Sequence, residues 1–350
     1  MAPVIFEPGV LARFGPKEYI WNMEKVDRRS KYMLGGFLVI AYTLPFGIGI
    51  YTDNVFFTRQ WLLDLTTVVL NGFMQGGVYA MFAVGLTMIF GVMRIINVAH
   101  GEMVMLGAYL SWASFFWMGF DPLAAMFFTL PIAFGLGWMI QKFLLNAVVG
   151  GPELTPLLMT FGLGLSMIYG VELIFTTDFR TIPYAPDSFQ IAESIVVGRS
   201  RLISFGMALV ISVGVFMFLK VHRLGKAIRA TAQNADVAMV CGINIYNIYM
   251  ITSGIAAALA VAGGALVSIQ FGFNPETGII YTLQAFAIIV LGGRGHFIGA
   301  MIGGVMLAVM ESLISFMLPN GTALVEIAAY GLMIFVLLIR PQGLMGAKEL

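Results

Sequence analysis

Charged residues are scarce in this sequence, and long uncharged stretches take their place. Asp, Glu, Lys and Arg make up 11% of the 350 residues, against about a quarter in soluble globular domains. Hydrophobic residues make up 59%. This composition excludes a soluble globular protein and indicates an integral membrane protein embedded in the lipid bilayer. The formal net charge of +1 leaves no basic surface suited to nucleic acid.

The single cysteine and a missing phosphate loop exclude further classes. Cys241 stands alone and the three histidines are far apart, so we predict no disulfide framework, no metal site and no cofactor. The pattern G-x-x-x-x-G-K-[ST] does not occur, because Lys226 is followed by Ala227 and lacks the upstream glycine. No serine or cysteine nucleophile stands beside His100 in the sequence. We therefore predict that the chain is not an enzyme and does not hydrolyse nucleotide itself.

Long apolar segments follow a mixed-charge leader. They are too long for buried core helices and lack the strict alternation of outer-membrane strands. We predict an all-α, polytopic bundle of about nine to ten membrane segments at 33–340, between a cytoplasmic leader (1–32) and a cytoplasmic tail (341–350). The segments lie near 33–52, 62–92, 102–118, 122–145, 155–175, 203–220, 247–271, 280–293, 297–317 and 323–340.

The distribution of Lys and Arg predicts the orientation. If the N-terminus is inside, alternation of the segments places most of the 19 Lys and Arg residues in the cytoplasm. The exceptions are Arg59, Arg180, Arg199 and Arg201. We predict that both termini are cytoplasmic and that Thr176 to Arg201 forms the main external loop, with a short helix or a hairpin.

Two segments have unusual lengths. As one straight helix, 62–92 is about 46 Å long against a hydrocarbon core of about 30 Å, so it either tilts strongly or breaks at Gly76 and Gly77. The segment 280–293 is short and ends in a glycine-rich turn, which is typical of a short or half-inserted helix. Small residues four apart predict close helix packing. They are Gly72/Gly76/Ala80, Ala256/Ala260/Gly264 and Gly299/Gly303.

Polar residues within the apolar segments are candidates for a substrate path, because such side chains face a bundle interior or a water-filled cavity. The candidates are Asn71, Gln75, Asn97, His100 and Glu102. Glu102 either pairs with His100 through a folded-back turn or lies at the start of the next helix, where the helix dipole favours an anion. Glu311 is a further buried acid, which forms either an interior hydrogen bond or a gate.

The polar stretch from Lys220 to Tyr246 separates two almost uncharged halves. Four cations stand within ten positions, next to an alanine-rich segment that suits a short surface helix. They are Lys220, Arg223, Lys226 and Arg229. Such a loop in a membrane protein indicates contact with a soluble partner.

Several ordered motifs resemble one family. The tract 71–109 contains INVAHGE at 96–102, and it is followed by RLGKAIRATAQNADVAMVCGIN at 223–244, PETG at 275–278 and VLGGRGHFIGAMIGG at 290–304. These motifs resemble the permease family of ABC importers for branched-chain amino acids, which also includes urea and short-amide permeases. The likeness covers roughly 62–345, and the leader and the segment 33–52 look like additions to the family pattern.

The resemblance implies a complex in the bacterial inner membrane. Its other members would be a related, non-identical permease, two cytoplasmic ATPases that hydrolyse the ATP, and a periplasmic solute-binding protein. The stretch 220–246 then looks like the helix that couples the permease to an ATPase. It departs from the importer signature EAA-x-x-x-G, and its candidate contact residues are Arg223, Gly225, Arg229 and Gly242. The alternative is that the arginines fix the topology and a glycine ends a helix.

A second class of function stays open from the residues alone. A secondary transporter or channel for a small polar solute such as urea would work without ATPases and would need a site at the membrane midplane. His100 and Glu102 are the residues that favour such a transporter or channel. The polar candidates suit a branched-chain amino acid, urea or an amide equally, so the sequence leaves the substrate open.

Overall fold

Helices form most of the described chain. The computed structural model describes residues 59–152, 154–192, 195–293, 295–318, 321–340 and 342–345, so the predicted leader and the segment 33–52 lie outside it. The elements are α3 (Arg59–Met93), α4 (His100–Met118), α5 (Pro122–Phe143), η2 (Leu145–Ala147), α6 (Leu154–Phe175), β1 (Ser188–Ala192), β2 (Ile195–Gly198), α7 (Arg199–Val221), α8 (Arg223–Gln233), α9 (Ala235–Val240), α10 (Ile245–Ser268), α11 (Thr277–Gly292), α12 (Phe297–Met317) and α13 (Gly321–Ile339).

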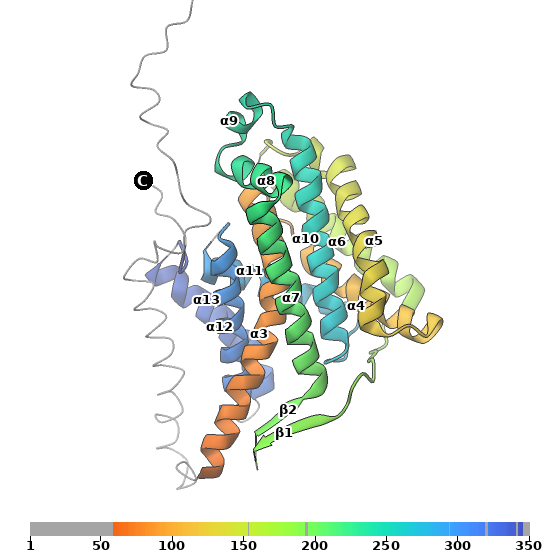
Figure 1. Ribbon diagram of the computed structural model, residues 1–350, viewed down its shortest axis with the longest axis vertical. Coiled ribbons are helices and arrows are strands. Elements are labelled where there is room, and N and C mark those ends of the chain that lie inside the picture. The colour runs from red at the N-terminus through yellow and green to blue at the C-terminus, as the bar shows by residue number, and fades with distance from the viewer. Residues whose placement is uncertain are drawn as a thin grey trace, which may run out of the picture.

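The two polar connections lie at opposite ends of the bundle. Figure 1 shows α8 and α9 at one end and the hairpin of β1 and β2 at the other, with α7 and α10 running between them. The strands pair antiparallel, with Ser188 opposite Gly198. The predicted hairpin is therefore confirmed, and so is a short helix in the stretch 220–246, which contains two.

Six described helices are long and apolar enough to cross a membrane. They are Gln60–Met93, Pro122–Ala147, Leu154–Phe175, Arg199–Val221, Ile245–Ser268 and Phe297–Met317. The chain is thus an all-α, multi-pass membrane protein. The total of nine to ten segments stays a prediction, since α11 has 16 residues and reaches about 24 Å, less than the roughly 30 Å of a hydrocarbon core.

The longest helix, α3, does not break. It runs through 35 residues without interruption, so of the two predicted alternatives, a strong tilt or a break at Gly76 and Gly77, the break is wrong. Both glycines instead allow close approach of a neighbouring helix. A Cβ on Gly76 would press on the backbone of Val305 in α12, and a Cβ on Gly77 would press on the ring of Phe205 in α7.

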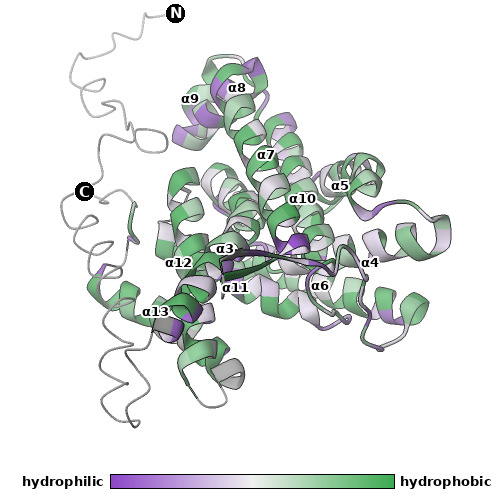
Figure 2. Ribbon diagram, turned by 60° about the horizontal axis from the view of Figure 1, so that its bottom comes forward, coloured by the Kyte–Doolittle hydropathy of each residue, from purple (hydrophilic) through white to green (hydrophobic). Residues whose placement is uncertain are grey.

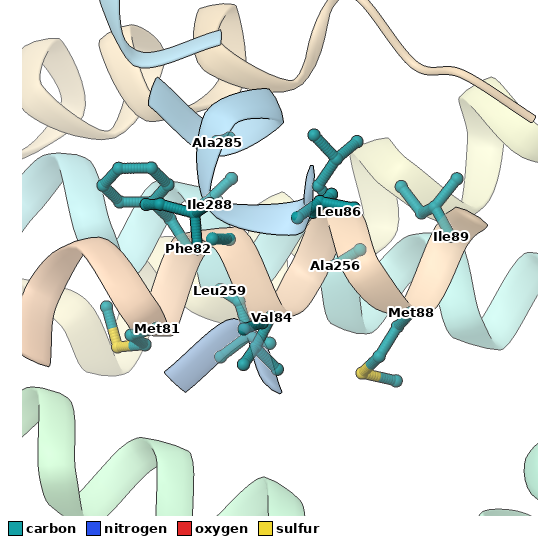
Figure 3. Packing of buried hydrophobic residues seen from close by; sticks show 14 of the residues in the cluster. Met81, Phe82, Val84, Leu86, Met88, Ile89, Ala256, Leu259, Ala285 and Ile288 are labelled. Carbon is teal, nitrogen blue, oxygen red and sulfur yellow. The ribbon is translucent and has the colours of Figure 1, made fainter. Parts of the chain in front are cut away.

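Small residues let the central helices approach each other backbone to backbone, as predicted. Gly264 of α10 faces the carbonyl of Val104 in α4, and Gly303 of α12 faces the carbonyl of Ile288 in α11. Larger side chains fill the remaining space around α3. Figure 3 shows Phe82 of α3 among the buried residues of this core, which also draws on α10 and α11.

A short part of the predicted tail is ordered against the bundle. The backbone N–H of Leu344 donates to Leu291 O at 2.8 Å, and that of Met345 donates to Gly292 O at 3.0 Å. These bonds satisfy carbonyl groups at the end of α11 that have no partner within the helix.

The α4–α10 contact gives a first prediction. A methyl group at Gly264 would overlap Val104 O, so Gly264→Ala should force the two helices apart and cost roughly 1–3 kcal/mol of stability. The measurement is the thermal unfolding midpoint of the purified protein in detergent.

The matched control is Gly206→Ala on α7, where an added Cβ meets nothing within 4 Å. This variant should keep or slightly raise the midpoint, because alanine favours a helix over glycine by about 1 kcal/mol. Equal midpoints for the two variants would contradict the packing explanation.

Candidate functional site

The connection between α3 and α4 folds back into the bundle. His100 is the first residue of α4, and its Nε2 lies 2.8 Å from the carbonyl oxygen of Phe82. Phe82 lies eleven residues before the end of α3, which is about 16 Å along the helix axis. The chain therefore returns along α3 before α4 begins, and α4 starts well inside the bundle.

Two threonines from distant helices satisfy the backbone of this connection. Thr160 Oγ1 of α6 accepts from the N–H of Val98 at 3.1 Å. Thr282 Oγ1 of α11 accepts from the N–H of Gly101 at 2.9 Å and donates to Val98 O at 3.1 Å. Irregular backbone at membrane depth is tolerated only where the protein supplies such partners.

Asn97 and His100 are part of the same arrangement. The side chain of Asn97 is buried, and its Oδ1 accepts from the N–H of Ala99 at 3.1 Å, which closes a tight turn before α4. The His100 ring is completely buried and lies against Gly85 of α3. Because Phe82 O can only accept, Nε2 of His100 carries the proton.

Glu102 lies at the junction of three helices. It is in the first turn of α4 and only 4% exposed. Its carboxylate occupies the space that a side chain on Gly278 would need, and its aliphatic part lies against Gly164 of α6. The INVAHGE and PETG motifs therefore meet here, and the glycine of the second motif makes room for the glutamate of the first.

The arrangement favours the dipole explanation for Glu102 over a pair with His100. His100 Nε2 is bonded to Phe82, and no hydrogen bond joins His100 to Glu102 in the described structure. The carboxylate lies in the first turn of α4 and next to Gly278 in the first turn of α11. Two helix N-termini thus converge on it, and their dipoles favour a negative charge.

Asn71 and Gln75 belong to a second group, on another part of α3. The amide of Asn71 donates to Val196 O of the hairpin at 3.4 Å. Gln75 and Tyr79 follow at intervals of four residues, so the three side chains share one face of the helix. Phe82 connects the two groups, since its carbonyl binds His100 while its ring centroid lies 5.7 Å from that of Tyr79.

The second group extends to α11 and α12. Gln284 Nε2 donates to Glu311 Oε1 at 3.1 Å and to the hydroxyl of Tyr79 at 3.3 Å. The interior hydrogen bond expected for Glu311 is confirmed.

The sequence did not single out four further residues of these two groups, which are Thr160, Thr282, Tyr79 and Gln284. Their signal was a hydroxyl or amide within an apolar segment, the same signal that selected Gln75.

The stretch 220–246 folds as two capped helices. His222 Nδ1 accepts from the N–H of Leu224 at 3.2 Å and begins α8, and Asn234 Oδ1 accepts from the N–H of Asp236 at 3.0 Å and begins α9. Gly242 has φ +83° and follows α9. Only glycine adopts this conformation easily, so Gly242 ends the helix.

The other predicted contact residues differ in exposure. Arg223 is exposed at the start of α8, and Gly225 is buried because α8 packs against the backbone of Phe218 and Leu219 in α7. Arg229 is half-buried, and its Nη2 donates to the carbonyl of Lys220 at 3.2 Å. Gly225 and Arg229 therefore hold α8 against the end of α7.

The outward surface of α9 is apolar although this end of the protein is its most polar part. Figure 2 shows hydrophilic segments gathered at α8 and α9. Within them, Val237 is 52% exposed, Met239 50% and Val240 89%. We call these three residues the α9 apolar surface.

Metal ligands do not gather in the described part of the chain. No three His, Cys, Asp or Glu side chains among these residues are placed to hold a metal ion.

Comparison with known proteins gives a consistent result. A family model described as the permease component of the branched-chain amino acid transport system matches residues 68–337. The high-affinity branched-chain amino acid transport system permease protein BraD of Pseudomonas aeruginosa is 33% identical over 295 residues, which span 80% of this chain and 95% of the relative.

Two relatives from Escherichia coli K12 represent two kinds of permease protein of one transport system. LivH is 34% identical over 298 residues, which span 80% of this chain and 94% of LivH. LivM is 23% identical over 383 aligned positions, which span 97% of this chain and 80% of LivM. The chain is thus more similar to LivH than to LivM.

The contact between Glu102 and Gly278 gives a second prediction. Gly278→Ala should destabilise the protein, because the new methyl group would overlap Glu102 Oε2 and the carboxyl carbon. Truncation of the glutamate removes both atoms, so the double variant Glu102→Ala/Gly278→Ala should be more stable than the sum of the single effects by at least about 1 kcal/mol.

A double-mutant cycle on thermal unfolding midpoints in detergent measures this coupling. Gly170→Ala on α6 is the control, since an added Cβ there meets nothing within 4 Å. Additive effects of Glu102→Ala and Gly278→Ala would show that the two motifs do not meet as described.

Proposed function

We propose a function from one premise: the chain belongs to the permease family of branched-chain amino acid transport systems. It is the permease subunit of an ATP-driven importer in the bacterial inner membrane, and it moves branched-chain amino acids or a related small neutral solute by alternating access. The observation that carries this proposal is the α8–α9 element, a capped helix pair that presents apolar side chains at one end of a membrane bundle.

The partners follow from the same premise. A LivM-like chain is the second permease, since relatives of both the LivH and the LivM kind are named as permease proteins of a high-affinity branched-chain system. Two ATPases hydrolyse ATP at the α8–α9 end, which is cytoplasmic together with both termini. A solute-binding protein delivers the substrate at the opposite end, where the β1–β2 hairpin lies.

The polar groups around α3 line or shape the substrate path. Asn71 and Gln75 lie toward the hairpin end, and Asn71 Oδ1 is a buried acceptor without a hydrogen-bond partner. Asn97, His100 and Glu102 hold the folded-back connection deeper in the bundle. A buried polar atom without a partner indicates a place for water or for a polar ligand group.

The ATPase contact is made by exposed residues of the helix pair. Arg223 and the α9 apolar surface meet the ATPase, while Gly225, Arg229 and Gly242 give the element its shape. Exposed apolar side chains in water favour association, because burial contributes about 25 cal/mol for each Å² removed from solvent.

Reconstitution tests the proposed function. Proteoliposomes that contain both permeases and the ATPases should take up leucine only with external binding protein and internal ATP. Proteoliposomes with this chain alone should take up none. ATP-independent uptake by this chain alone would instead support a secondary transporter or channel.

A substitution in α9 tests the coupling role. Val240→Asp removes apolar surface and adds a charge at a side chain that is 89% exposed, so folding should be preserved. Leucine-stimulated ATPase activity of the reconstituted complex should fall about tenfold, which corresponds to about 1.4 kcal/mol of lost interaction.

Gln233→Glu is the control, because it adds the same charge to an exposed position of α8 without removing apolar surface. It should leave the stimulated activity within about twofold of the wild type, a difference of about 0.4 kcal/mol. If leucine stimulates the ATPase activity of the Val240→Asp complex as strongly as that of the control, the α9 apolar surface does not meet the ATPase.

A further inference from the structure

Glu311 is a buried acid at membrane depth. It lies on α12 and is 8% exposed. Its described hydrogen bond comes from the neutral amide of Gln284, at 3.1 Å. An ionised carboxylate in such a place is expensive unless a positive charge or several donors compensate it.

Around Glu311, the nearest interaction of a cation in the described part of the chain is with Tyr79, which Arg201 approaches closely enough to interact with electrostatically. No described Lys, Arg or His forms an ion pair with Glu311, and the acid Glu326 on α13 is near enough to repel it. Glu102, the other deeply buried acid, differs because two helix N-termini converge on it. Glu311 lies well beyond the first turn of its helix, so the helix dipole does not stabilise a negative charge there.

The acceptor oxygens of Glu311 and its neighbours match the number of donors of an ammonium group. Gln284 Oε1 is buried and has no hydrogen-bond partner, and the hydroxyl of Tyr79 lies 3.3 Å from Gln284 Nε2. Together with the carboxylate these oxygens are three acceptors, and a primary ammonium group has three donors.

Aromatic rings border the same place. The Phe82 centroid lies 5.7 Å from that of Tyr79 and 5.8 Å from that of Tyr281, and Tyr281 interacts electrostatically with Glu311. Faces of aromatic rings attract cations.

Polar side chains of α3 extend from the site toward the hairpin end of the bundle. Tyr79, Gln284 and Glu311 are each 7–8% exposed, whereas His100 in the other group is 0% exposed. The polar face of α3 continues from Tyr79 through Gln75 to Asn71, which is bonded to the hairpin. A cationic group arriving from that end thus meets hydrogen-bonding side chains along one helix face.

We propose that Glu311, Gln284 and Tyr79 form a site for the ammonium group of the transported amino acid. This inference rests on the proposed import function and adds the residues that recognise the charged end of the substrate. Glu311 supplies the negative charge, and Gln284 positions the carboxylate and offers a further acceptor. The ligand class is a primary ammonium compound, which separates amino acids from urea and amides.

The test is leucine uptake by the full complex in proteoliposomes, with binding protein outside and ATP inside. Glu311→Gln keeps the shape and removes the charge, so uptake should fall at least tenfold. Glu311→Asp keeps the charge and should restore a substantial part of it. Glu172→Gln is the control, because this acid lies on α6 and none of the interactions described for Glu311 involves it, and it should transport like the wild type.

The outcomes separate the inference from the proposed function. If the wild-type complex shows no ATP-dependent leucine uptake, the proposed function fails. If the wild type transports and Glu311→Gln transports equally well, Glu311 is a protonated structural acid and the inference is overturned. A loss in Glu311→Gln that Glu311→Asp does not relieve also overturns it, because shape and not charge then matters.

A measurement on the unmutated complex decides the case if Glu311→Gln fails to assemble. Dicyclohexylcarbodiimide modifies buried carboxyl groups, and mass spectrometry of the peptide that contains Glu311 reports the extent of modification. Leucine, binding protein and ATP together should lower it at least threefold relative to binding protein and ATP alone. Equal modification in the two conditions would overturn the site.

Discussion

The bundle depends on one constraint: polar groups at membrane depth must find their partners within the protein, because lipid offers none. The connection before α4 satisfies this constraint through Thr160 and Thr282, which come from helices far away in the sequence. Glycines bring the helices together at these bonds. Gly278 leaves the room that Glu102 occupies, and Gly85 does the same for the His100 ring.

The same constraint distinguishes the two buried acids. Glu102 has the N-termini of α4 and α11 beside it, whose dipoles favour a negative charge, although its Oε2 is buried without a hydrogen-bond partner. Glu311 has a neutral amide, a phenol and a second acid around it. An acid that the fold leaves uncompensated is a better candidate for a ligand that brings its own positive charge.

Hydropathy predicts the helices well because a membrane span must be long and apolar whatever it packs against. The predicted 62–92 and 297–317 correspond to Arg59–Met93 and Phe297–Met317. The partners of polar side chains were harder to predict. Thr282 bonds Gly101 across 181 positions, and Gly76 looked like a break because sequence does not show that Val305 lies against it. Because the polar candidates are close in the sequence, they also looked like one group. In the structure they form two, one with Asn97, His100 and Glu102 and one with Asn71 and Gln75.

Under the proposed function, the contacts of α8 decide which helix first receives a movement from the ATPase. Gly225 leaves no room for a side chain between α8 and α7, and Arg229 binds the last turn of α7 through Lys220 O. On the side of α3 and α12, α8 borders a pocket lined by Met88 and Phe297, and Leu219 of α7 lines the same pocket. A close backbone contact transmits displacement. Under the proposed function, ATPase closure therefore acts on α7 first, and α7 passes the movement to α3 where Phe205 packs on Gly77. Gly77 lies two residues from both Gln75 and Tyr79, so the movement reaches α3 on the face opposite the polar side chains that lead to Glu311.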